Sequence, residues 1–78
     1  MNSPQITIDP EVMLGKPVIA GTRITVELIL EELAAGMTTA QLVSSYPRLT
    51  PEAVSAALAY ASKAVQNDVQ RHMTRQSA

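Results

Sequence analysis

The sequence predicts a mainly α-helical fold: a three-helix helix-turn-helix domain of the homeodomain or winged-helix kind, with a short N-terminal β-hairpin. Two observations support this class. After residue 25, apolar residues recur at helical spacing in three segments, and each segment follows a threonine that can cap a helix. Before residue 25, two short β-branched runs are separated by prolines and glycines, which is typical of a small hairpin.

The N-terminal element is expected to contain two short strands. Ile6-Thr7-Ile8 alternates as a strand does, and Val18-Ile19-Ala20 can form the second strand before Gly21. Between them, Asp9 and Pro10 resemble a helix start and Gly15 a helix end, so we expect one helical turn over 10–14. Two short strands are marginally stable alone, and pairing with the same strands of a second protomer would stabilise them.

The first helix is expected between a Thr25 cap and Gly36, a residue type that commonly follows a helix end. One face is apolar and is expected to be buried; it comprises Val26, Ile29, Leu30 and Leu33. The opposite face is acidic and is expected to be solvated; it comprises Glu27, Glu31 and Glu32.

The second and third helices have the spacing of a helix-turn-helix. Thr38 can cap a helix over 39–45, and Pro47 prevents its continuation. Thr50 followed by Pro51 is a strong start for the third helix. The turn between the two helices, 46–49, suits the motif in length, although it lacks the usual glycine. The third helix carries an apolar face made of Val54, Ala57, Leu58, Ala61 and Val65.

The composition indicates a weak core and hence a dimer. The chain has 78 residues, with no Phe, Trp or Cys and only two Tyr. A chain of this length forms one domain that buries a small share of its surface, and no disulfide can compensate. We therefore expect a symmetric homodimer, with the domain in residues 1–65 and a C-terminal helical extension or tail in residues 66–78.

Charge and motifs exclude several classes of protein. The sequence has no apolar run that could cross a bilayer and no secretory signal, so a cytoplasmic protein is expected. It has no cysteine, no phosphate-binding glycine motif, and His72 as its one histidine. We therefore expect no enzyme activity, no cofactor and no metal site. The net charge of −1 argues mildly against a freestanding nucleic-acid binder.

Candidate DNA contacts are nevertheless present around the start of the third helix. The first turns lack Asn, Gln and Arg, which usually contact base edges, so direct readout of sequence would be weak. A solvated helix face without a ligand is the alternative interpretation. The candidates are Arg48, Thr50, Ser55, Lys63 and, from the N-terminal segment, Lys16.

Arg23 has two interpretations. It lies just before the first helix, where a pair with Asp9 would lock the preceding loop. We favour this structural lock, and a phosphate contact beside a DNA groove is the alternative.

The apolar stripe of the third helix extends beyond the expected core. Val65, Val69 and Met73 continue it in steps of four residues. A stripe of this kind is either a frayed tail or a surface for a partner, and periodicity leaves both open.

The chain resembles domain-of-unknown-function family 433, a small helix-turn-helix-like family of bacteria and archaea that includes VapB-type antitoxins. The resemblance covers about residues 6–61. The block Gly-Lys-Pro-Val-Ile-Ala-Gly-Thr-Arg over 15–23 is its most specific part. Other matching positions are Asp9-Pro10, Val26, Leu30, Gly36, Tyr46-Pro47, Leu49-Thr50 and the run 54–61.

This resemblance implies a dimeric DNA-binding domain without enzyme activity, a PIN-like ribonuclease toxin as partner, and autoregulation of the operon that encodes the pair. We therefore expect an antitoxin-like regulator of a type II toxin–antitoxin pair. The alternative is a protein–protein interaction module that does not bind DNA. Toxin binding is expected from the end of the third helix and the tail, where an arginine could enter the carboxylate-lined metal site of the nuclease. The candidates are Val65, Val69, Arg71, Met73 and Arg75.

Overall fold

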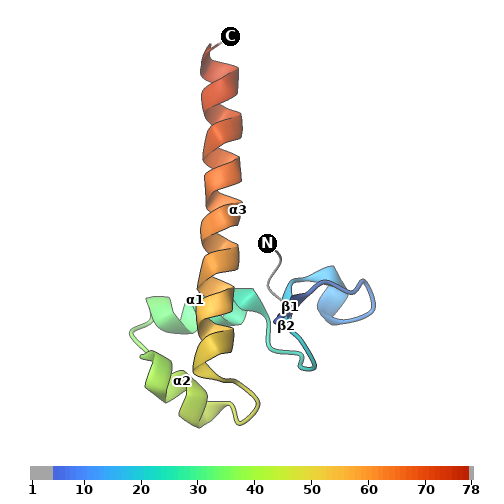
Figure 1. Ribbon diagram of the computed structural model, residues 1–78, viewed down its shortest axis with the longest axis vertical. Coiled ribbons are helices and arrows are strands. Elements are labelled where there is room, and N and C mark those ends of the chain that lie inside the picture. The colour runs from blue at the N-terminus through green and yellow to red at the C-terminus, as the bar shows by residue number, and fades with distance from the viewer. Residues whose placement is uncertain (1–4, 78) are drawn as a thin grey trace.

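Three helices follow a two-stranded antiparallel sheet, as predicted. The computed structural model describes the backbone of residues 5–77 and the side chains of residues 5–67. The elements are β1 (Ile6–Thr7), a 3₁₀ turn η1 (Met13–Gly15), β2 (Val18–Ile19), α1 (Val26–Ala34), α2 (Thr39–Ser45) and α3 (Pro51–Ser77). In Figure 1, α1 crosses the first half of α3, α2 lies near its base, and the rest of α3 extends away from the other elements. No helix in the described part of the chain is long and apolar enough to span a bilayer.

The two strands form where they were expected, each one residue shorter than predicted. Ile6 pairs with Ile19 and Thr7 pairs with Val18. Val18 also forms an isolated bridge with Thr25, so the hairpin is tied directly to the start of α1. Val18 and Ile19 are buried. The hairpin is therefore a part of the domain rather than a separate arm.

The helical turn predicted over 10–14 is wrong. The Oδ1 atom of Asp9 accepts a hydrogen bond from the Glu11 amide, and the Asp9 carbonyl accepts one from the Val12 amide. These two bonds form one capped turn, of the kind that begins a helix. The chain then passes through left-handed conformations at Met13 (φ 50°), Leu14 (φ 60°) and Gly15 (φ 82°), which turn it toward β2.

The three predicted threonine caps are confirmed. Each hydroxyl oxygen accepts a hydrogen bond from a backbone amide in the first turn of its helix. Thr25 accepts from Leu28 at 2.9 Å, Thr38 from Gln41 at 3.1 Å and Thr50 from Ala53 at 3.1 Å. Gly36 follows α1 at φ 105°, a conformation in which glycine is favoured. Cap chemistry thus sets the helix starts.

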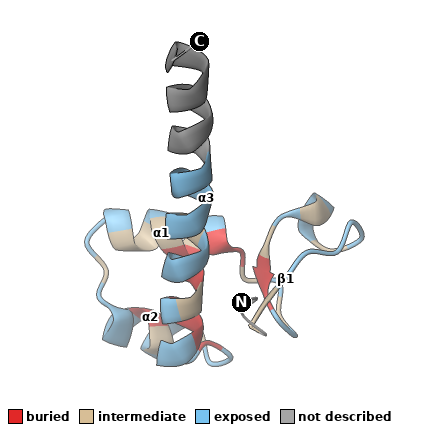
Figure 2. Cartoon of the chain, turned by 45° about the horizontal axis from the view of Figure 1, so that its top comes forward, coloured by how far each residue is buried: buried red, intermediate tan, exposed pale blue. Residues whose placement is uncertain are grey.

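The core lies where α1, α2 and the first half of α3 meet (Figure 2). Leu58, on the apolar face of α3, is 45% exposed, and Val65, which continues that face past the core, is 61% exposed. Ala53 is buried instead, one turn before the buried Ala57. The buried side of α3 thus passes through Ala53, Val54 and Ala57, and Leu58 lies outside it. The buried cluster comprises Ile19, Val26, Ile29, Leu42, Leu49, Ala53, Val54 and Ala57.

Candidate functional site

An open groove of about 840 Å³ lies between the N-terminal hairpin, the β2–α1 loop and the turn that joins α2 to α3. Its lining is mainly apolar, and its charged side chains are Asp9, Arg23 and Arg48. The other lining residues are Thr7, Ile8, Pro10, Val12, Val18, Gly21, Thr22, Ile24, Tyr46 and Pro47. The groove thus brings together three segments that are distant in the sequence.

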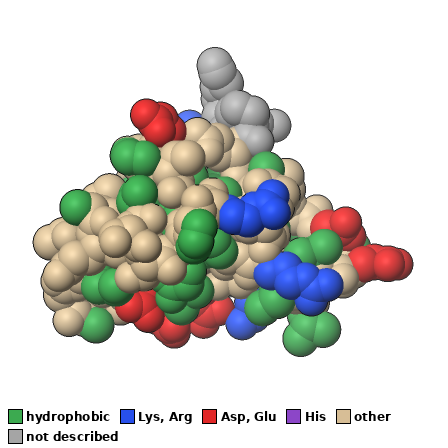
Figure 3. Space-filling view, turned by 90° about the horizontal axis from the view of Figure 1, so that it is seen from below, with side chains coloured by type: hydrophobic (Ala, Val, Ile, Leu, Met, Phe, Trp, Pro, Cys, Tyr) green, Lys and Arg blue, Asp and Glu red, His purple; other side chains and the backbone are tan. Residues whose placement is uncertain are grey.

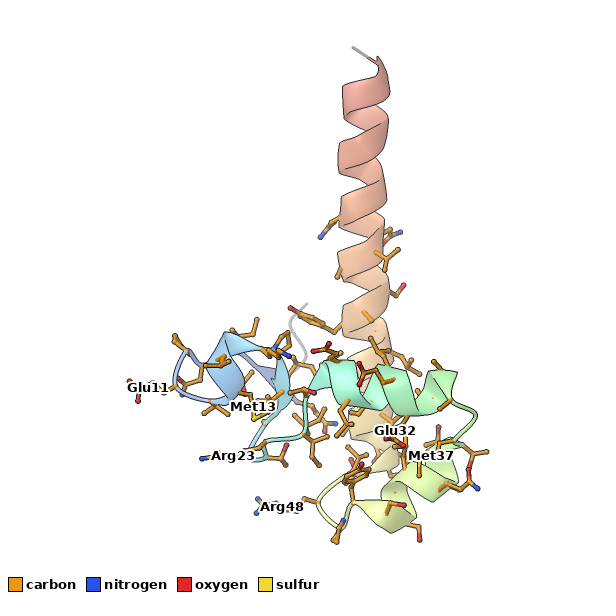
Figure 4. All side chains as sticks on the ribbon, turned by 180° about the vertical axis from the view of Figure 1, so that it is seen from behind. Glu11, Met13, Arg23, Glu32, Met37 and Arg48 are labelled. Atoms are coloured by element: carbon orange, nitrogen blue, oxygen red, sulfur yellow. The ribbon has the colours of Figure 1, made fainter. Side chains whose placement is uncertain are left out.

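Two arginines come from different segments to this groove. Arg23 belongs to the β2–α1 loop and Arg48 to the turn before α3, and both are exposed. Figure 4 labels both side chains, which point toward the same side of the molecule. In Figure 3, basic side chains gather toward one side of the face seen from below. The groove therefore carries two arginines and one aspartate, in a chain of net charge −1.

Gly21 lies beside Arg48. A Cβ atom built on Gly21 would lie 3.6 Å from Nη2 of Arg48, so the guanidinium group rests beside the glycine backbone. Gly21 also has a φ of 77°, which disfavours residues with a side chain. This glycine therefore serves the bend of the loop.

The expected lock between Asp9 and Arg23 is not formed. Both residues line the groove, but no ion pair joins them among the side chains of residues 5–67. The Asp9 carboxylate instead accepts the Glu11 amide in its own turn. Arg23 is thus an exposed cation rather than a structural clamp.

Thr22 holds the loop in place of Arg23, and sequence reasoning missed this role. Its hydroxyl group donates to the Ile19 carbonyl at 2.8 Å and accepts from the Ile24 amide at 3.0 Å. Its own amide also donates to the Ile19 carbonyl, at 3.0 Å. The available signal was the Gly-Thr pair itself, because threonine hydroxyls commonly close turns by bonding nearby backbone groups.

Lys16, a predicted DNA contact, is paired within the chain. Its Nζ atom lies 2.9 Å from Oε1 of Glu27 on α1, and both side chains are about half exposed. The hydrogen bond and charge of Glu27 raise the pKa of Lys16 above its ordinary value of 10.5. The pair therefore persists below that raised pKa and is lost as the pH rises through it. Lys16 is not among the residues that line the groove.

The remaining predicted DNA contacts lie on α3 or at its start. Ser55 and Lys63 are exposed and eight residues apart, so they share one face of the helix with the exposed Ala59. The Thr50 oxygen is used as the cap of α3, which leaves its hydroxyl hydrogen to donate. An exposed helix face thus begins beside Arg48.

The predicted toxin contacts fall mostly beyond the described side chains. Val65 is exposed on α3, as a partner surface would require. The side chains of Val69, Arg71, Met73 and Arg75 lie outside the described residues. Within the described part of the chain, no three His, Cys, Asp or Glu side chains are grouped to hold a metal ion.

Comparisons with known proteins place the chain in a family. A family model described as "Protein of unknown function (DUF433)" matches residues 6–61. The fold is similar to a crystal structure of a DUF433 member protein from Anabaena variabilis ATCC 29413, with a TM-score of 0.75 and 31% sequence identity. That match covers 90% of this chain and 68% of the other chain. A search of the curated proteins found no match. The chain belongs to the DUF433 family of proteins of unknown function.

Proposed function

We propose that the protein is a DNA-binding regulator of the antitoxin type, which represses its own operon and neutralises a PIN-like ribonuclease. The observation that supports DNA binding is the exposed face of α3, which begins directly after the exposed Arg48. Helix-turn-helix proteins place such a face in the major groove while nearby basic residues contact phosphates.

The chemistry of this face limits the expected mode of binding. Ser55 and Lys63 are its polar and basic members, whereas Ala59 offers only a methyl group. The exposed Glu52 would oppose phosphate contact near the helix start. A single copy would therefore bind weakly, and two copies on one operator would be needed for useful affinity.

The proposed toxin partner uses the later part of α3. Val65 is an exposed apolar side chain on a helix that continues to Ser77, well past the core. An amphipathic helix of this kind can bind in a groove of a partner protein. The arginines of residues 66–78 would enter the acidic metal site of the nuclease.

DNA binding is tested by fluorescence anisotropy with a duplex from the region upstream of the protein's own gene. A scrambled duplex of the same length measures non-specific binding. We expect tighter binding to the upstream duplex, with an affinity that falls as salt rises. Lys63→Gln should weaken binding to both duplexes, whereas Lys16→Gln, which removes a lysine paired with Glu27, should have little effect. Absence of binding at 50 mM salt would refute the DNA-binding role.

Toxin binding is tested by co-expression with the product of the adjacent reading frame. A complex that forms with the full chain and is lost on deletion of residues 66–78 would support the proposal. Unchanged co-purification after that deletion would show that the tail is not the toxin-binding segment.

One observation favours a second candidate, an interaction module that does not bind DNA. Leu14 is 93% exposed and occupies a left-handed conformation (φ 60°, ψ 29°). A leucine in this conformation costs about 1–2 kcal/mol, and exposure gives no packing energy in return, so a partner contact would explain its presence. Leu14→Asn should then abolish partner binding without lowering the melting temperature, because asparagine tolerates this conformation. Retained partner binding in this variant would argue against the module.

A further inference from the structure

We infer that Arg23 and Arg48 together bind the phosphate backbone of one DNA strand beside α3. This inference rests on the DNA-binding function proposed above. It adds to that function a direct role for the β2–α1 loop, where the sequence favoured a structural lock by Arg23 and left a phosphate contact as the alternative.

The geometry of the groove supports a joint site. Arg23 and Arg48 are 25 positions apart in the sequence, yet they line one groove and point toward the same side (Figure 4). Arg48 rests 3.6 Å from the position that a Gly21 Cβ would occupy, and Gly21 lies in the same loop as Arg23. Arg48 thus lies beside the loop that carries Arg23.

The charges around the groove leave both arginines available. Neither makes an ion pair with a carboxylate among the described side chains, whereas Lys16 is paired with Glu27. Asp9 also lines the groove, and its negative charge offsets part, but not all, of the charge of the two arginines. Two unpaired guanidinium groups at one groove suit an anion with several oxygen atoms, since each group donates in a planar fork.

The position of the pair favours nucleic acid over an acidic protein. Arg48 is three residues ahead of Pro51, the first residue of α3, whose exposed face is the proposed DNA contact. Phosphate contacts on DNA-binding proteins commonly flank the helix that enters the groove, where they fix its position. The arginine pair extends that surface from α3 to the β2–α1 loop.

Salt-dependent anisotropy measures the contribution of each arginine. We expect Arg23→Gln and Arg48→Gln each to weaken binding equally for the upstream and the scrambled duplex. Each should reduce the slope of log K against log salt by about one, and the double variant by about two. Lys16→Gln removes the same charge from a paired lysine and should leave the slope unchanged. Arg23→Lys keeps the charge and should retain most of the slope. This variant distinguishes an effect of the charge on binding from an effect of the substitution on the loop structure.

The outcomes distinguish this inference from the function on which it rests. A wild-type chain that binds neither duplex would refute both. A wild-type chain that binds DNA with a slope unaffected by Arg23→Gln would refute the arginine pair alone. Loss of binding to an acidic partner protein in Arg23→Gln, with DNA binding intact, would also overturn the inference and assign the groove to protein recognition.

Discussion

Thr22 holds the β2–α1 loop because its hydroxyl group both donates and accepts a hydrogen bond. The donor bond to Ile19 and the acceptor bond from Ile24 connect the two ends of the loop. Arg23 follows directly in the sequence but is exposed and makes no ion pair within the described part of the chain. Thr22 therefore stabilises the loop, whereas its neighbour Arg23 is available for contact with a ligand.

This division predicts opposite results for two adjacent substitutions. Thr22→Val keeps the shape of the side chain and removes both hydroxyl hydrogen bonds, so it should lower the free energy of unfolding by about 1–2 kcal/mol. Arg23→Ala removes an exposed side chain and should change it by less than about 0.5 kcal/mol. Urea unfolding followed by circular dichroism measures both. A larger loss of unfolding free energy for Arg23→Ala than for Thr22→Val would show that Arg23 is the structural lock.

At the scale of single elements, the stability of the short helix α2 depends on its N-terminal cap. It has seven residues, and helices this short are marginal without external support. Thr38 accepts the Gln41 amide, and the Gln41 side chain accepts the Thr38 amide at 2.8 Å. This reciprocal capping box satisfies two amides that have no partner inside the helix.

Loss of the capping box should be measurable beside a matched control. Thr38→Ala should lower the free energy of unfolding by about 1 kcal/mol. For a domain of this size, such a loss corresponds to a melting temperature lower by about 4–8 °C. Thr39→Ala changes the next threonine, which is exposed within the first turn and caps nothing, and should be neutral or slightly stabilising. Equal effects of the two substitutions would show that the cap does not stabilise α2.

At the scale of the whole molecule, the core is small and several apolar side chains remain outside it. The buried cluster consists of aliphatic residues and two alanines, Ala53 and Ala57. Leu58 and Val65 lie seven residues apart on α3 and are exposed. The expected homodimer would bury some of this surface and add stability that the single chain lacks.

Sedimentation at micromolar concentration tests the dimer. We expect a mass near twice the 8.4 kDa of one chain, and a melting temperature that rises with protein concentration, because association stabilises the folded state. A monomer with a high melting temperature would show that the core suffices without a partner.

The sequence by itself determined the order, type and limits of the main elements. Thr25, Thr38 and Thr50 marked helix starts because a cap bonds amides two or three residues away, and such local chemistry is visible in the sequence. The strands were also recognised, each within one residue of its observed end. The helical turn over 10–14 failed because Met13, Leu14 and Gly15 take left-handed conformations, which a right-handed helix cannot contain.

Tertiary structure alone decided which side of α3 is buried and what surrounds Arg23. Helical periodicity allowed Leu58 to share the core face, but in the fold the buried side of α3 passes through Ala53, Val54 and Ala57 and leaves Leu58 exposed. Likewise, the sequence offered Asp9 as a partner for Arg23, whereas the fold brought Arg48 to the same groove. Both results depend on segments that meet only in the folded chain, and local spacing does not encode the distance between them.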